Sequence, residues 1–343
     1  MPFPVTDNVV KSARHTTFYL ACGAADAPAI IFLHGWPELS LSWRHQLPCF
    51  AALGFRAIAP DMRGYGRSSV YRRHEDYAVE HIVDDMLELL RALGQDKAVW
   101  VGHDWGSPIV WSLASHHPDK CYGVGSLCVP YIAKGFAIEN FVHLVDRTIY
   151  PDAEFSVGQW DYQLFYEESF DQACKGFDAD VRNTVKALFR KGRPEGRGKP
   201  SRTAHVRKDG GWFGGAGKLP DLPIDEDVLT EGDLDAYVAA LEANGFFGPD
   251  SWYMNRKRNL EFAAKAVNGG QLRMPVLFLH GAYDYTCETM TSRLAEPMRA
   301  DCENLTEVVV PSGHWMAQEK PAAVNAALAQ WLATQLPEVW PSA

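Results

Sequence analysis

The stretch that decides the fold is Val99-Trp100-Val101-Gly102-His103-Asp104-Trp105-Gly106-Ser107. An apolar, β-branched run leads into it, a segment with helical spacing follows it, and Gly-x-Asp-x-Gly lies between the two. This is the strand–turn–helix spacing of a nucleophile elbow, in which small residues two positions either side allow a sharp turn. The spacing therefore predicts that Asp104 lies at the tip of the turn, above the end of a buried strand.

The residue type at the tip indicates which kind of bond is attacked. Most elbows carry Ser or Cys, and a Ser alkylated at a saturated carbon would become an ether that is hard to cleave. A carboxylate alkylated there becomes an ester, which water can hydrolyse. Asp104 therefore favours displacement at an sp3 carbon followed by ester hydrolysis, with a surface Asp in a Gly-rich turn as the alternative.

Short apolar runs alternate with helix-like segments on both sides of this stretch. Strands are predicted at 16–22, 29–33, 55–59, 99–103, 123–129, 275–279 and 305–310, and helices at 42–53, 79–93, 108–115, 290–296 and 320–336. Alternation of this kind predicts an α/β fold with a mostly parallel central sheet and helices on both faces.

The alternation is interrupted between residues 131 and 265, where aromatic residues are dense. Helices are predicted at 230–241 and 252–267, and the basic, Gly/Pro-rich stretch Arg190–Lys218 is predicted to be a long surface loop. We interpret residues 131–265 as a helical cap (lid) domain inserted into a core domain formed by residues 1–130 and 266–343.

Composition narrows the class of protein. A chain of 343 residues with 47% hydrophobic and 22% charged residues is typical of a globular protein. A net charge of -10 argues against a nucleic-acid partner, because phosphate contacts need a basic face. No apolar run is long enough to span a membrane, and no signal peptide is recognised. Seven scattered cysteines without metal-ligand spacing indicate reduced thiols, so we expect a cytoplasmic protein.

Three candidate catalytic residues follow predicted strands, namely Asp104, Asp284 and His314. Open α/β sheets bind ligands at the carboxyl ends of their strands, and nucleophile, acid, histidine is the α/β-hydrolase order. These residues are therefore predicted to form a catalytic triad, with Glu139 as the fallback for the acid.

A second short motif, His34-Gly35-Trp36-Pro37, follows an early predicted strand. The second donor of an oxyanion hole is expected at this place, so the backbone amides of Trp36 and Trp105 are predicted to form that hole. His34 is expected to be structural, and a cis bond before Pro37 would aim the Trp36 amide.

Taken together, Gly102–Gly106, His34–Pro37 and Asp61-Met-Arg-Gly-Tyr-Gly-Arg67 resemble the α/β-hydrolase-fold epoxide hydrolases, and the resemblance covers nearly the whole chain. It implies the α/β-hydrolase fold. Two departures are present. The resemblance does not include the phosphatase domain of some animal relatives, which we expect this protein to lack, and Ser107-Pro108 stands where a further Gly is common.

Two stretches of the predicted cap also resemble motifs of the soluble epoxide hydrolases. They are Asp161-Tyr162-Gln163-Leu164 and Ser251-Trp-Tyr253-Met-Asn255-Arg. The resemblance implies that Tyr162 and Tyr253 hydrogen-bond the epoxide oxygen. This fits the chemistry, because a neutral phenol with a pKa of about 10 can donate a proton to a developing alkoxide at neutral pH.

The resemblance implies an epoxide hydrolase, an ether-bond hydrolase that needs no metal or organic cofactor and acts on a small apolar epoxide. Asp104 would form a covalent ester, and water activated by His314 and Asp284 would hydrolyse it to a diol. The oligomeric state stays open, with a homodimer as one option.

The main alternative is a haloalkane or haloacid dehalogenase, which uses the same Asp nucleophile. The Trp105 indole could serve as a halide donor. However, haloalkane dehalogenases usually carry Asn at the position of Trp36, and fluoroacetate dehalogenases carry arginines just after the Asp. A non-catalytic receptor of this fold would predict a broken triad, and a serine esterase would need Ser at position 104.

Overall fold

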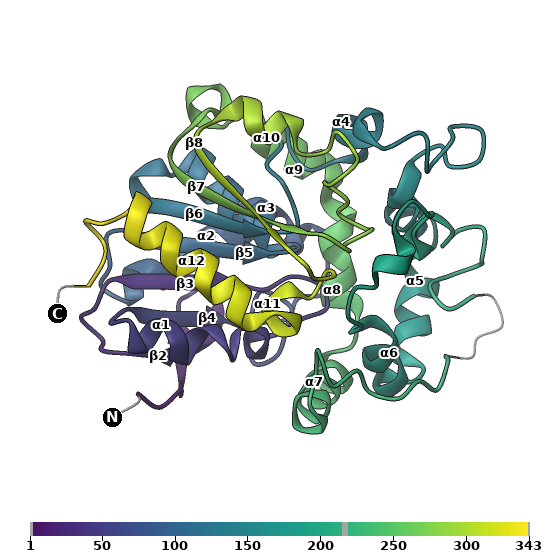
Figure 1. Cartoon of the computed structure of the whole chain (residues 1–343). Coiled ribbons are helices and arrows are strands. Elements are labelled where there is room, and N and C mark those ends of the chain that lie inside the picture. Colours follow the sequence, from purple (N-terminus) through teal and green to yellow (C-terminus); the bar gives the residue numbers. More distant parts are fainter. Residues whose placement is uncertain (1–2, 215–218, 342–343) are drawn as a thin grey trace.

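The computed structural model describes residues 3–214 and 219–341, and in this part of the chain eight strands form one sheet in the order β1-β2-β4-β3-β5-β6-β7-β8 (Figure 1). The first two pairings, β1 with β2 and β2 with β4, are antiparallel, and all later pairings are parallel. The strands are β1 Thr6–Lys11, β2 Thr16–Cys22, β3 Ala29–Leu33, β4 Arg56–Pro60, β5 Ala98–His103, β6 Cys121–Leu127, β7 Leu272–Gly281 and β8 Cys302–Val310. The predicted α/β-hydrolase fold class is confirmed.

Helices cover the sheet and fill the interval between β6 and β7. Those that flank the sheet are α1 Gln46–Ala52, α2 Val79–Ala92, α3 Gly106–His116, α10 Glu296–Asp301, α11 Met316–Glu319 and α12 Pro321–Gln335. Those between β6 and β7 are α4 Ile138–Phe141, α5 Asp161–Asp178, α6 Val181–Leu188, α7 Glu231–Asn244, α8 Phe247–Ser251 and α9 Arg256–Ala263. Figure 1 shows α5, α6 and α7 together beyond one end of the strands, while α12 crosses a face of the sheet. No described helix has the length and apolarity needed to cross a membrane.

The central strands form because their side chains are apolar on both faces. Every residue of β3 and of β5 is buried, as expected for strands covered by helices on both sides. The edge strand β1 was not predicted, because its sequence TDNVVK is polar and mostly exposed. Its pairing with β2 gives it structure that its own composition does not indicate.

The predicted helix at 290–296 is wrong. The Glu288 carboxylate accepts hydrogen bonds from the backbone N–H groups of Met290, Thr291 and Ser292, which holds this stretch in turns. Helix α10 begins only at Glu296 and carries its proline in the first turn, where the missing N–H costs nothing.

The stretch Arg190–Lys218 is irregular as predicted, apart from 3-10 turns at Pro194–Gly196 and Arg202–Ala204. Its prediction as a surface loop is only partly right, because Thr203, Ala204 and Val206 are buried. Its last residues, 215–218, lie outside the described residues. The boundaries 131–265 for a cap domain stay a prediction.

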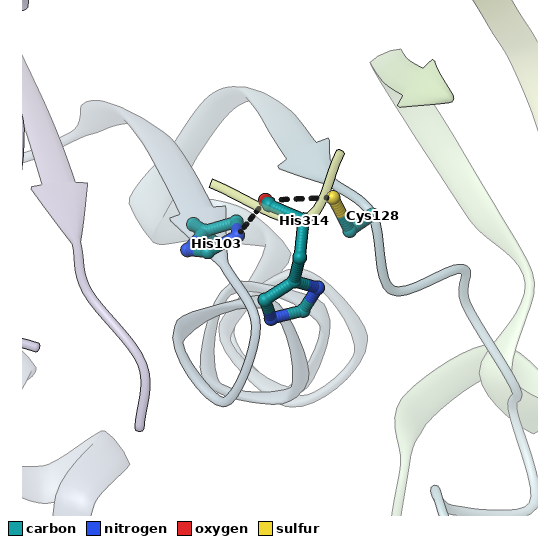
Figure 2. Close-up of side chains that lie close together, drawn as sticks. All are labelled: His103, Cys128 and His314. Carbon is teal, nitrogen blue, oxygen red and sulfur yellow. Dashed lines mark hydrogen bonds between the residues drawn. The ribbon is translucent and has the colours of Figure 1, made fainter. Parts of the chain in front are cut away.

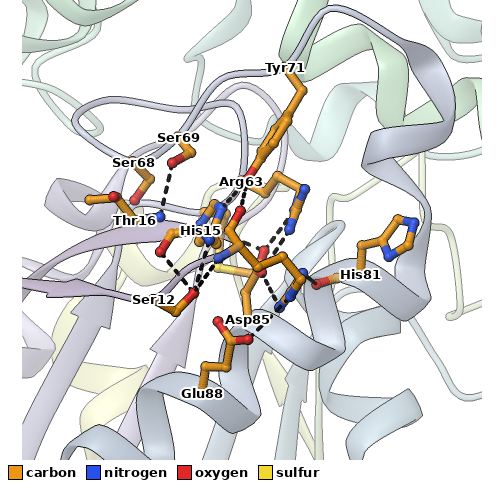
Figure 3. Close-up of polar contacts among 12 residues, drawn as sticks. Ser12, His15, Thr16, Arg63, Ser68, Ser69, Tyr71, His81, Asp85 and Glu88 are labelled. Atoms are coloured by element: carbon orange, nitrogen blue, oxygen red, sulfur yellow. Dashed lines mark hydrogen bonds and ion pairs between the residues drawn. The ribbon is translucent and has the colours of Figure 1, made fainter.

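A buried ion-pair network ties the turn after β4 to α2 (Figure 3). Arg63 donates to both oxygens of Asp85 at 2.7 and 2.8 Å, and Arg14 lies 2.7 Å from the same carboxylate. Burial and these two guanidinium groups lower the pKa of His15 to about 3, so His15 is neutral. The Arg63 carbonyl accepts from the Trp252 indole at 3.1 Å, which links this network to the segment between β6 and β7.

Candidate active site

The turn between β5 and α3 has the geometry of an elbow. Asp104 has a φ of 49°, in the left-handed region that few non-glycine residues adopt. A Cβ on Gly102 would lie 2.4 Å from the carbonyl oxygen of Gly106, and a Cβ on Gly106 would lie 2.1 Å from that of Leu33. Only glycine fits at both positions. Ser107 is fully buried and α3 starts at Gly106, so the departure at Ser107-Pro108 leaves this helix intact.

The Asp104 carboxylate touches the loop after β3 and the loop after β8. Its Oδ1 accepts the backbone N–H of Trp36 at 2.8 Å, and its Oδ2 lies 3.5 Å from Nε2 of His314. A Cβ on Gly35 would lie 2.5 Å from Asp104 Oδ1 and 2.6 Å from the Trp105 amide nitrogen. Both predicted oxyanion amides therefore lie beside the carboxylate. The Trp36–Pro37 peptide is cis, as expected.

His314 lies between two carboxylates. Its Nδ1 is 2.7 Å from Asp284 Oδ2, and Asp284 Oδ1 accepts the backbone N–H groups of Thr286 and Cys287 at 3.0 Å. Burial opposes the charge of Asp284, but His314 and these hydrogen bonds lower its pKa to about 2. Burial likewise opposes a charged His314, yet Asp284 and Asp104 outweigh it and raise the histidine pKa well above its usual value.

The two predicted tyrosines lie in the cavity above Asp104. Tyr162 comes from the first turn of α5, and Tyr253 comes from the 3-10 turn Trp252–Asn255. Their ring centroids are 5.7 Å apart, and both line a cavity of about 580 Å³ together with Asp104 and His314. Burial, followed by smaller effects that include Asp104, raises both tyrosine pKa values well above 10, so both phenols keep their protons at neutral pH.

Both phenol oxygens lack strong partners among the described residues. The Tyr162 hydroxyl has one long hydrogen bond, from Gln163 at 3.4 Å, and the Tyr253 hydroxyl has none. The rings themselves are held: Tyr253 stacks on Tyr166 at 4.5 Å and meets the edge of Trp105 at 5.2 Å. These donors are therefore positioned by packing and remain available to a ligand.

The start of α5 is anchored from outside the cavity. The Asp161 carboxylate accepts from the Arg207 guanidinium at 2.7 Å and from the Arg207 backbone at 2.8 Å. This contact lies directly before Tyr162 in the chain. It fixes the first turn of the helix that carries the phenol.

The sequence analysis did not predict the buried pair of His103 and Glu38 behind His314. Figure 2 shows His103 and Cys128 beside the His314 carbonyl. His103 donates through Nε2 to the His314 carbonyl at 2.7 Å and through Nδ1 to Glu38 at 2.7 Å. Burial opposes both charges, but the pairing raises the pKa of His103 to about 10 and lowers that of Glu38 to about 2. Cys128 donates to the same carbonyl at 3.4 Å. These contacts orient the backbone that carries His314, and only the adjacency of His103 to Asp104 hinted at them.

Two other sequence-level candidates lie outside the chemistry. His34 is buried, with Nδ1 bonded to the Gly35 carbonyl and Nε2 accepting the Met62 N–H, both at 2.9 Å. This matches the expected structural role. Glu139 is half-exposed on α4, 3.7 Å from Arg256, and is not brought to His314.

Side chains of the types that bind metal ions lie close together at this site. His103, Cys128 and His314 lie within 4.8 Å of one another, as do Asp284, Cys287 and His314. His103, Cys128, Asp284 and His314 already hydrogen-bond within the protein, and burial raises the pKa of the Cys287 thiol well above its usual value. The donor set therefore suits a hydrogen-bonded triad better than a metal shell.

Comparisons with known proteins agree with this geometry. The α/β hydrolase fold family matches residues 28–321. Epoxide hydrolase A of Mycobacterium tuberculosis is 32% identical over 332 residues, which cover 95% of this chain and 97% of that protein. Bifunctional epoxide hydrolase 2 of Sus scrofa is 32% identical over 90% of this chain, but the chain spans only about half of that longer relative, 52%.

Solved structures point the same way. The crystal structure of epoxide hydrolase A from Mycobacterium thermoresistibile matches with a TM-score of 0.79 and 29% identity, covering 96% of this chain and 99% of that one. An epoxide hydrolase from an endophytic Streptomyces matches with a TM-score of 0.76 and 30% identity over 96% of this chain. The chain therefore belongs to the α/β-hydrolase-fold family of epoxide hydrolases.

Proposed function

We propose that the protein hydrolyses an epoxide to a vicinal diol through a covalent ester on Asp104. One observation carries this proposal. A carboxylate at the tip of an elbow faces, across one cavity, two buried phenols whose hydroxyls have almost no partner within residues 3–214 and 219–341. A carboxylate nucleophile suits attack at a saturated carbon, and two phenols suit an oxygen leaving group that must be protonated.

In the first half-reaction an Asp104 oxygen attacks one epoxide carbon, and the bond from that carbon to the ring oxygen breaks. The ring oxygen develops negative charge and takes a proton from Tyr162 or Tyr253. Because burial keeps both phenols protonated, both proton donors carry their protons before the substrate enters. The product is a hydroxyalkyl ester of Asp104.

In the second half-reaction His314 acts as the general base. Esterification removes the negative charge of Asp104, and with it one of the two carboxylates that favour a protonated His314. His314 then gives up its proton, which restores the phenol deprotonated in ring opening. The neutral His314 takes a proton from water, and this water attacks the ester carbonyl. The amides of Trp36 and Trp105 stabilise the oxyanion, and the diol leaves as Asp104 is restored. Asp284 orients His314 and balances its charge.

The dehalogenase alternative is not favoured. Halide needs N–H donors rather than proton donors, and the Trp36 indole N–H is already bonded to Asp250 at 2.8 Å. The relatives named above are epoxide hydrolases. As part of the same proposal, residues 131–265 act as a cap that brings the phenols to the nucleophile, and the enzyme is cytoplasmic. The option of a homodimer stays open.

The test is a substrate screen. Styrene oxide, alkyl epoxides and bromoalkanes are offered to the wild type and to Asp104→Asn, and diol and halide are measured. Diol from the epoxides, lost in Asp104→Asn, is expected. Halide release at a higher kcat/KM than diol formation would contradict the proposal.

A further inference from the structure

One carboxylate oxygen joins the loop after β8 to the stretch of chain that follows α6. Oε2 of Glu319, the last residue of α11, accepts the backbone N–H of Gly313 at 2.8 Å and that of Gly192 at 3.0 Å. Gly313 directly precedes His314, and Gly192 lies four residues beyond the end of α6. Because Glu319 is buried, water competes little for these two hydrogen bonds.

The two glycine backbones meet without room for a side chain. A Cβ on Gly192 would lie 2.4 Å from both the Cα and the N of Gly313, and a Cβ on Gly313 would lie 2.4 Å from the N of Gly192. Carbon atoms in contact prefer a separation of about 3.5–4.0 Å. Any larger residue at either position must therefore push the two stretches of chain apart.

The residue on the other side of the catalytic histidine makes a second contact of the same kind. The Trp315 indole N–H donates to the Leu188 carbonyl at 2.9 Å, and the Trp315 ring stacks on Phe189 at 4.4 Å. Residues 188–192, here named the docking segment, therefore contact both chain neighbours of His314. Leu188 and His314 also line the same cavity, so this junction forms part of the active-site wall.

The junction lies beside the base rather than beside the nucleophile. Asp104 is fixed by its own turn and by the backbone N–H of Trp36 at 2.8 Å. The backbone of His314 is fixed instead through Gly313, whose N–H is held by Glu319. A misplacement of about 1 Å can cost roughly 100-fold in rate. The step that uses His314 should therefore be sensitive to this junction, and the step that uses only Asp104 and the phenols should not.

We propose that Glu319 is a positioning residue that couples the docking segment to the orientation of His314, so that ester hydrolysis, but not alkylation, depends on how this segment is seated. The inference rests on the proposed function, because the step that it concerns is the second half-reaction. Glu319 acts through Gly313 and takes no part in the chemistry itself.

The experiment uses three variants and a matched control. Glu319→Met keeps the length of the side chain but removes the acceptor, and Glu319→Gln keeps an oxygen that can accept both N–H groups. Gly192→Ala displaces the docking segment from Gly313 while Glu319 stays in place. The control, Gly176→Ala, makes the same change in α5, where the added methyl group would meet no described residue beyond its own helix within 4 Å.

Two measurements are made on each variant. Single turnover of styrene oxide gives the rate of alkylation from tryptophan fluorescence and the rate of hydrolysis from decay of the ester adduct by intact mass. Amide hydrogen exchange, followed by mass spectrometry on peptides covering 188–193 and 311–316, reports how firmly the two stretches are held, and it does so without substrate.

Glu319→Met and Gly192→Ala should each slow hydrolysis by roughly 10- to 100-fold and leave alkylation at the wild-type rate. Glu319→Gln and Gly176→Ala should keep both rates. Exchange in 311–316 should rise in Gly192→Ala although that peptide is not mutated, because the docking segment helps to hold it. If Glu319→Met does not fold, the comparison of Gly192→Ala with Gly176→Ala decides the question.

Equal slowing of both steps in Glu319→Met would indicate a general loosening of the fold and would overturn the inference. So would hydrolysis that is as slow in Glu319→Gln as in Glu319→Met, or wild-type hydrolysis in Gly192→Ala. Failure of the proposed function looks different, because the wild type would then turn over no epoxide. Exchange alone would in that case test the coupling: a rise in 311–316 in Gly192→Ala would support it, and wild-type exchange would overturn it.

Discussion

Replacing the two cavity phenols tests the proposed chemistry most directly. Tyr162→Phe and Tyr253→Phe should each slow alkylation of Asp104 by roughly 10- to 1000-fold, the effect of losing one transition-state hydrogen bond or proton donor. The double variant should lose nearly all epoxide turnover, because no phenol remains to protonate the leaving oxygen. Bromoalkane turnover, if any, should be little affected, because halide leaves without a proton.

The same structure predicts a small effect on folding. Each change deletes one oxygen and leaves a buried ring in place. The Tyr162 hydroxyl has only its 3.4 Å bond to Gln163, and the Tyr253 hydroxyl has no protein partner among the described residues. We expect each substitution to change the free energy of unfolding by no more than about 1 kcal/mol. A loss of rate therefore cannot be ascribed to unfolding.

The assay is single-turnover alkylation followed through tryptophan fluorescence, first with an epoxide and then with a bromoalkane. Trp36 and Trp212 stack at 5.4 Å in the cavity wall and provide the signal. Tyr166→Phe is the matched control. Tyr166 is fully buried, its hydroxyl has no partner in the described part of the chain, and its ring stacks on Tyr253 without lining the cavity. Wild-type alkylation of the double Phe variant by the epoxide would refute the role of both phenols.

Three further predictions concern the nucleophile, the base and the pair behind the base. Asp104→Ala should abolish turnover, and single turnover of the wild type in 18O-labelled water should label Asp104; label in the first diol formed would instead indicate direct attack by water. His314→Gln should still be alkylated and should accumulate the ester, visible by intact mass, whereas absence of any adduct would place His314 in the first step too. Glu38→Gln should cost roughly 3–5 kcal/mol of unfolding free energy near pH 5.5, because it leaves His103 buried without its partner. The pH window follows from the two pKa shifts. The pKa of His103 is raised from 6.5 to about 10, so its contribution to the free energy of unfolding is complete below pH 6.5 and is lost toward pH 10. The pKa of Glu38 is lowered from 4.5 to about 2, so its contribution is complete above pH 4.5 and is lost toward pH 2. Denaturant midpoints of the variant and the wild type are therefore compared at pH 5.5 and pH 9.5. The difference should be smaller at pH 9.5, and equal differences at the two pH values would contradict the assignment of a charged Glu38–His103 pair.

Local sequence patterns predicted much of the fold because the central strands are apolar on both faces. The strand predicted at 29–33 matches β3, and that at 16–22 matches β2. The patterns failed where strand pairing or a side-chain hydrogen bond, rather than the local apolar pattern, decides the structure. β1 is polar and depends on its pairing with β2, and 290–296 is held in turns by the single carboxylate of Glu288.

The residues of the candidate site could be predicted where their position relative to a strand places them, and could not where a contact joins distant residues. Asp104, Asp284 and His314 were found because each follows a strand, and parallel strands carry such residues to one edge. The Glu38–His103 pair was missed because its members are 65 positions apart and nothing in the spacing joins them. The stretch Arg190–Lys218 was predicted to be a surface loop that also shapes the pocket. Part of it does line the cavity, but its composition does not reveal which of its side chains face the nucleophile.

The placement of the two phenols has a consequence for how such an enzyme changes over time. In the proposed mechanism, the nucleophile and the residues of ester hydrolysis are carried by the loops after β3, β5, β7 and β8, whereas the proton donors of ring opening, Tyr162 and Tyr253, lie between β6 and β7. Substitutions between β6 and β7 can therefore alter which electrophile is opened and which substrate shape fits, while the residues that hydrolyse the ester stay unchanged. The two halves of the reaction are, in this sense, separately evolvable.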